Sequence, residues 1–121
     1  MKNWTIKFFK SFYYAGEGIK SGFKERNMII HCIMAVLVIG MAWLFKLTFV
    51  EWSVVLVLIA LVFAAELINT SIEELANVVK KNNNCEYEAT KATRDLAAGA
   101  VLVIAIVSAV LGLVIFLPKI F

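Results

Sequence analysis

Three long apolar stretches constrain the fold of this sequence more than any other feature. They cover residues 28–45, 52–68 and 96–117, and Glu66 is the only Lys, Arg, Asp or Glu among them. A helix needs about 20 apolar residues to cross the hydrocarbon core of a bilayer, and each stretch approaches or exceeds that length. Because 62% of the 121 residues are hydrophobic, against about 45–50% in a soluble domain, lipid is expected to cover much of the surface. We therefore predict an all-α integral membrane protein.

The chain has room for one domain, which we place over residues 1–121. The expected membrane-crossing helices span residues 28–47, 50–80 and 86–117. The second of them is expected to extend beyond the membrane into the cytoplasm. Asn84 is expected to cap the last of these helices, because its side chain can accept hydrogen bonds from free amides. Pro118 is expected to end that helix, because proline lacks an amide hydrogen.

Lys and Arg residues gather in two segments, one before the first stretch and one between the second and third. They are Lys2, Lys7, Lys10, Lys20, Lys24 and Arg26, and then Lys80, Lys81, Lys91 and Arg94. Loops on the cytoplasmic side of a membrane carry an excess of such residues. We therefore expect the N-terminus and the second loop in the cytoplasm and the C-terminus outside.

An amphipathic helix is predicted over residues 4–24. Its apolar residues recur every three or four positions and form one stripe, with charged residues on the opposite side. The stripe consists of Trp4, Phe8, Phe12, Ala15, Ile19 and Phe23. Such a helix lies on the membrane surface. It is either an anchor only or, because Tyr14 projects near Lys7 and Lys10, also part of a functional site.

The second stretch holds the most informative polar residues. Glu66, Asn69, Glu73 and Asn77 are separated by three, four and four positions, so they share one helix face. If Trp52 marks the outer interface, a rise of 1.5 Å per residue places Glu66 about 21 Å and Glu73 about 31 Å along the axis. The second distance is about one hydrocarbon thickness. One helix face is thus expected to hold a carboxylate in lipid and another at the water boundary.

A carboxylate inside the hydrocarbon is a functional candidate, because it costs about 2.5–3.5 kcal/mol at the bilayer centre. The alternative for Glu66 is a pair with a cation from a neighbouring helix. Glu73 taken alone also fits an ordinary solvated helix end. His31, at the start of the first span, is interpreted as an interfacial residue and not as a ligand.

The start of the third helix carries Glu88, Lys91, Arg94 and Asp95 on neighbouring turns. Lys91 and Asp95 fit an ordinary i,i+4 ion pair worth a few tenths of a kcal/mol. The functional alternative is a cation that binds phosphate beside an acid that positions it. The sequence has no Gly-rich phosphate loop, no Cys/His metal spacing and no nucleophile elbow.

At this point the sequence resembles the small bacterial membrane lipid kinases, the prokaryotic diacylglycerol kinase and undecaprenol kinase family. Residues 66–73, ELINTSIE, resemble the family signature E-x-x-N-[ST]-A-[IV]-E, and residues 94–101, RDLAAGAV, are similar to K-D-x-A-A-G-A-V. Residues 25–27 and 116–119 resemble the undecaprenol kinase branch of Gram-positive bacteria. The resemblance covers nearly the whole chain.

The resemblance implies an ATP-dependent kinase, using Mg²⁺, that forms a homotrimeric bundle in the bacterial cell membrane. Glu66 would be the general base toward the lipid hydroxyl, and Glu25 and Glu73 would hold the metal at the ATP phosphates. Further nucleotide contacts would come from Tyr14, Glu86, Tyr87, Glu88, Arg94 and Asp95. Supporting roles fall to Asn69, Asn77 and Lys91, and Lys7 matches a basic position near the lipid.

Three positions depart from the family pattern. Asn77 stands where the family usually has Asp, Arg94 where it usually has Lys, and Ser71 where it usually has Ala. The geometry of an Arg side chain at a phosphate differs from that of Lys. These departures concern the nucleotide side of the expected site more than the lipid side.

The leading hypothesis is the phosphorylation of a membrane alcohol, undecaprenol first and diacylglycerol as the alternative. A proton-coupled transporter with Glu66 as carrier is a competitor of another class, although no other span offers it a polar path. A non-catalytic relative that serves as a scaffold is the third hypothesis, suggested by Asn77 and Arg94.

Overall fold

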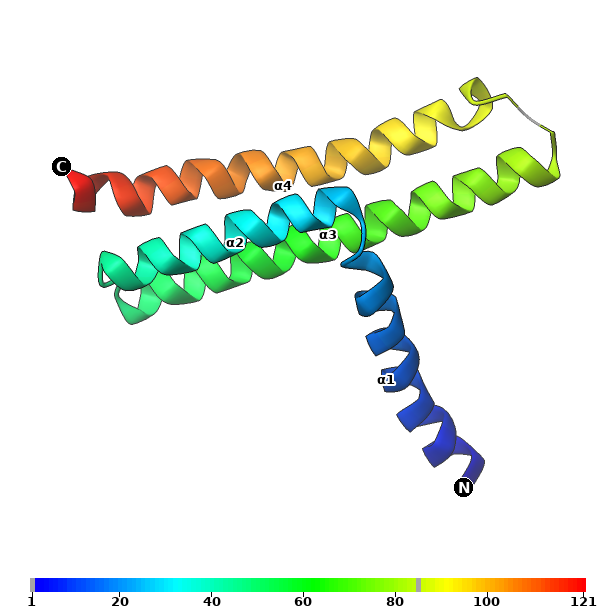
Figure 1. Cartoon of the computed structure of the whole chain (residues 1–121), viewed down its shortest axis with the longest axis horizontal. Coiled ribbons are helices and arrows are strands. Elements are labelled where there is room, and N and C mark those ends of the chain that lie inside the picture. The colour runs from blue at the N-terminus through cyan, green and yellow to red at the C-terminus, as the bar shows by residue number, and fades with distance from the viewer. Residues whose placement is uncertain (1, 85) are drawn as a thin grey trace.

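The computed structural model describes residues 2–84 and 86–121, and this part of the chain forms four helices. Three long helices lie side by side, and the N-terminal helix projects away from them (Figure 1). The helices are α1 (Lys2–Gly22), α2 (Arg26–Leu44), α3 (Phe49–Asn82) and α4 (Glu88–Ile120). The all-α prediction is confirmed for the described residues.

The helices α2, α3 and α4 are each long and apolar enough to cross a membrane, as predicted. In the most apolar 18-residue window of each helix, no more than 17% of the residues are buried. Large apolar side chains such as Leu37, Leu61 and Leu102 are therefore exposed in the single chain. So much contiguous apolar surface requires lipid or further protein to cover it.

The helix α2 ends at Leu44, three residues before the predicted boundary, because the chain turns there in a Schellman motif. Lys46 has a positive φ of 53°, its amide donates to the Trp43 carbonyl, and the Leu47 amide donates to the Ala42 carbonyl. Glycine usually occupies the left-handed position of this motif. Since Lys46 takes that position here, the sequence lacked the usual signal for the helix end.

A capping box begins α3 immediately afterwards. The Thr48 amide donates to Glu51 Oε1 at 2.9 Å, and the Glu51 amide donates to Thr48 Oγ1 at 3.2 Å. Glu51 also pairs with Lys119 of α4, with Nζ 3.0 Å from Oε1. This ion pair joins the end of α4 to the start of α3, beside a small core of Ala42, Leu47, Val55 and Phe116.

Two predictions about helix ends are wrong. Asn84 does not cap α4: it lies in the loop with a φ of 50°, and the N-cap residue is Tyr87, which makes no side-chain cap hydrogen bond. Pro118 does not end α4, which continues to Ile120. Helical hydrogen bonding continues past the proline, since the Phe121 amide donates to the Leu117 carbonyl at 3.0 Å.

The projecting helix α1 meets α3 at its C-terminal end, two residues before the predicted boundary. Gly22 is buried there against the side chain of Leu67, which occupies the space that a Cβ atom would need. One residue further on, Phe23 packs edge to face on Phe63 with ring centroids 5.4 Å apart. The end of α1 is therefore attached to α3 next to Glu66.

We expect Gly22→Val to destabilise the attachment of α1 by about 1–3 kcal/mol, because overpacking forces neighbouring groups apart. Thermal unfolding in detergent micelles measures the loss, and Leu67→Ala in the same chain should restore part of it. Gly16→Val is the matched control, since nothing lies within 4 Å of a Cβ atom at that position. An equal loss in both variants would mean that close packing at Gly22 is unimportant.

Candidate functional site

Glu66 is buried in the middle of α3, with 3% of its surface exposed. Its Oε2 atom lies 3.5 Å from Nε2 of His31, which α2 contributes. The histidine carries a positive charge only when protonated. The expectation that His31 is an interfacial residue does not include this contact, because no local pattern in the sequence indicates which residue of α2 faces Glu66.

One turn along α3, Asn69 and Glu73 form a second polar pair. Asn69 is 4% exposed, and its Nδ2 atom donates to Glu73 Oε1 at 3.3 Å. The side-chain oxygen of Asn69, Oδ1, is buried without a hydrogen-bond partner in the described part of the chain. A buried acceptor without a donor is unfavourable by about 1–3 kcal/mol. This oxygen is therefore available to a ligand.

The extension of α3 beyond Glu73 is joined to α4 through Arg94. The Arg94 guanidinium donates from Nη2 to Asn77 Oδ1 at 2.8 Å and from Nε to Thr90 Oγ1 at 2.9 Å. The same guanidinium stacks over the Tyr87 ring, 5.0 Å from its centroid, and Lys80 approaches that ring at 5.7 Å. Asn77 and Arg94, two of the three positions at which the sequence departs from the family pattern, are thus hydrogen-bonded to each other.

Lys91 and Asp95 pair with each other on the outside of α4. The Lys91 Nζ atom lies 2.6 Å from Asp95 Oδ2, and both side chains are more than half exposed. An exposed i,i+4 pair contributes only a few tenths of a kcal/mol. The geometry therefore matches the ordinary ion pair described above, and Asp95 remains reachable from solvent.

Glu25 is the N-cap residue of α2, and its exposed carboxylate makes no cap hydrogen bond. Within residues 2–84 and 86–121, no three His, Cys, Asp or Glu side chains form a cluster that could hold a metal ion. Mg²⁺ commonly takes only one or two protein carboxylates, together with phosphate oxygens and water. Glu73 and the neighbouring Asn69 oxygen are hard donors of the right kind for such a shared site.

The remaining predicted residues lie on exposed surfaces. Tyr14 packs against the ring of Tyr13, with centroids 5.7 Å apart, on a face of α1 that is open to solvent. Lys7 is exposed on the same helix, and its carbonyl accepts a hydrogen bond from Ser11 Oγ. Glu86 and Glu88 are exposed on either side of Tyr87, at the start of α4. The single chain brings none of these side chains to Glu66.

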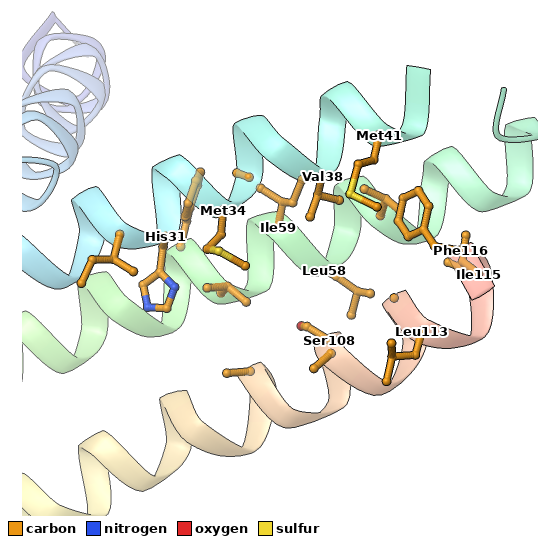
Figure 2. Close-up of a pocket in the computed structure, with 18 of the residues that line it drawn as sticks. His31, Met34, Val38, Met41, Leu58, Ile59, Ser108, Leu113, Ile115 and Phe116 are labelled. Atoms are coloured by element: carbon orange, nitrogen blue, oxygen red, sulfur yellow. The ribbon is translucent and has the colours of Figure 1, made fainter. Parts of the chain in front are cut away.

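An apolar groove of about 500 Å³ runs between α2, α3 and α4. Figure 2 shows His31 at one end of it and Phe116 at the other, with Met34 and Val38 of α2 along one side. The only other polar side chain in its lining is Ser108, whose Oγ atom is buried without a partner in the described structure. The groove has the volume of a small-molecule site. It runs along the three helices and ends at His31, the residue that contacts Glu66.

Comparison with known proteins agrees with the motifs. A family model described as prokaryotic diacylglycerol kinase matches residues 13–116. An undecaprenol kinase from Bacillus subtilis is 40% identical over 119 residues, which make up 98% of this chain and 94% of that protein. A diacylglycerol kinase from Synechocystis sp. is 35% identical over 109 residues, 89% of this chain and 61% of that protein. No solved structure matches the chain.

The match extends over most of the chain and includes both the α3 motif around Glu66 and the start of α4. The helical architecture, with three helices able to cross a membrane, is consistent with it. This chain therefore belongs to the prokaryotic diacylglycerol kinase family.

Proposed function

We propose that this protein is a membrane lipid kinase that transfers the γ-phosphoryl group of ATP to a lipid alcohol. Undecaprenol is the first candidate, because the relative named undecaprenol kinase aligns with nearly the whole chain, and diacylglycerol is the alternative. The observation that carries the proposal is the polar face of α3. On this face Glu66 is buried, and Glu73, about two turns further along the helix, is half-buried. A lipid hydroxyl and a water-soluble phosphate donor can meet only at such a boundary.

Glu66 acts as the general base. Its carboxylate takes the proton of the lipid hydroxyl while the hydroxyl oxygen forms a bond to the γ-phosphorus of ATP. The bond between that phosphorus and the β,γ-bridging oxygen breaks, and ADP leaves. General-base catalysis by a positioned carboxylate contributes about 10²–10⁴-fold. Phosphoryl transfer otherwise requires mainly positioning and neutralisation of charge.

The phosphate side of the site is built from the cytoplasmic ends of α3 and α4. Glu73 and Glu25 would hold Mg²⁺, which neutralises the phosphate charge when it is bound. Asn69 orients Glu73 through its hydrogen bond. Arg94, with Lys91 in support, binds phosphate oxygens, and Asp95 with Tyr87 completes the nucleotide contacts.

The chain would sit in the bacterial cell membrane with its N-terminus in the cytoplasm and its C-terminus outside, according to the distribution of Lys and Arg. We further propose a homotrimer with sites between protomers. The helix α1 projects away from the bundle (Figure 1), so it would bring Lys7 and Tyr14 to a neighbouring protomer, where that protomer's own Glu86 and Glu88 would complete the nucleotide contacts.

The direct test uses the purified protein in lipid vesicles with radiolabelled ATP and Mg²⁺. Undecaprenol and diacylglycerol are offered separately and then in competition, and labelled lipid phosphate is quantified. We expect labelled undecaprenyl phosphate, and a kcat/KM for undecaprenol that is higher than the kcat/KM for diacylglycerol. Preference for diacylglycerol would move the substrate assignment, and no labelled lipid with either alcohol would favour the non-catalytic alternative.

We expect Arg94→Ala to raise the KM for ATP by about 10–100-fold, because a hydrogen bond from a charged group contributes about 1.5–3 kcal/mol. Steady-state kinetics at saturating lipid measure the change. Lys81→Ala, which removes an exposed cation from the end of α3, is the matched control and should leave the KM within about twofold, as surface charges contribute little. If both substitutions raised the KM for ATP equally, Arg94 would contribute only its positive charge and not a specific contact with phosphate.

A further inference from the structure

We propose that His31 is a positioning residue for Glu66, an inference that rests on the proposed kinase function. The carboxylate is nearly inaccessible to water, and the contact from Nε2 of His31 to its Oε2 atom at 3.5 Å comes from a different helix. A buried carboxylate is stabilised only when a partner faces it. The imidazole therefore fixes the orientation of the base across the α2–α3 interface.

The contact divides the work between the two carboxylate oxygens. His31 faces Oε2, so we assign Oε1 to the proton of the lipid hydroxyl. The tautomer that suits this arrangement has its hydrogen on Nε2, which donates toward Oε2. A separation of 3.5 Å is longer than a close hydrogen bond, and catalytic contacts of this kind commonly shorten when the substrate is bound.

His31 also connects the base to the apolar groove. The imidazole is 22% exposed, and it forms a polar end of the groove, opposite the end at which Phe116 lies (Figure 2). A hydroxyl at the end of a hydrocarbon chain in this groove would arrive beside His31 and Glu66. The residue is thus placed both to hold the carboxylate and to border the position of the alcohol.

The test compares two substitutions that differ in hydrogen-bonding ability. His31→Leu removes the donor, and we expect kcat to fall by about 100-fold, since a misplacement of about 1 Å has that effect on a reacting group. His31→Gln retains an N–H donor at a similar distance from the backbone and should recover most of the lost kcat. The KM for ATP should stay unchanged in both, because His31 does not contact the phosphate side.

Leu37→Met is the matched control, because Leu37 lies on the same helix α2, is more than half exposed and does not line the groove. It should keep the kcat of the unsubstituted protein, and thermal unfolding in detergent checks that all three variants are folded. A normal kcat in His31→Leu, or a His31→Gln variant as slow as His31→Leu, would overturn the inference. An unsubstituted protein without lipid kinase activity would instead overturn the proposed function.

Discussion

Glu66→Gln should lower kcat for lipid phosphorylation by at least about 100-fold, the lower end of what a general base contributes. Glutamine has nearly the same shape as glutamate, so the packing between α2 and α3 is kept while the ability to accept the substrate proton is lost. Single-turnover transfer of labelled phosphate from bound ATP measures the chemical step directly. ATP binding itself should be unaffected.

Glu51→Gln is the control, since it removes a carboxylate from the start of the same helix. Glu51 pairs with Lys119 and takes part in the capping box of α3, so this variant should lose some thermal stability and keep its turnover. If Glu66→Gln retained normal turnover, another group would have to accept the proton. The assignment of the base would then be wrong.

The number of spans and their positions along the chain could be predicted, because hydropathy is a property of a contiguous segment. The ends of the helices were less predictable. Lys46 adopts the left-handed conformation that glycine usually supplies, and Pro118 lies within α4 rather than after it. In both places contacts to residues of the preceding turn decide the conformation, and the composition of the segment does not reveal them.

In the candidate site, too, contacts within one helix could be predicted and contacts between helices could not. The spacing of four residues between Asn69 and Glu73 predicts a shared helix face, and the structure has a hydrogen bond between them. The contacts of Glu66 with His31 and of Asn77 with Arg94 join different helices. Such contacts depend on how two helices are rotated against each other, for which a single sequence provides no periodic signal.

Glu73→Gln should weaken the binding of Mg²⁺ and leave the fold of the protein intact. We expect kcat/KM for Mg²⁺·ATP to fall by at least about 100-fold, because even the partners of metal ligands contribute about 10–100-fold. The amide oxygen of the glutamine can still accept the hydrogen bond from Asn69 Nδ2, so the helix face should stay ordered. Steady-state rates measured against total Mg²⁺ should show the loss, with partial recovery at high metal concentration.

Glu74→Gln is the matched control for this experiment. Glu74 is the next residue along α3, but it lines the hollow between α1 and α3 together with Gly18 and Leu67. Its substitution removes the same charge at the same depth, so an effect of the general negative potential would be equal in the two variants. A metal-dependent loss confined to Glu73→Gln would therefore identify a ligand, whereas equal losses would mean that the acidic end of α3 acts only through its total charge.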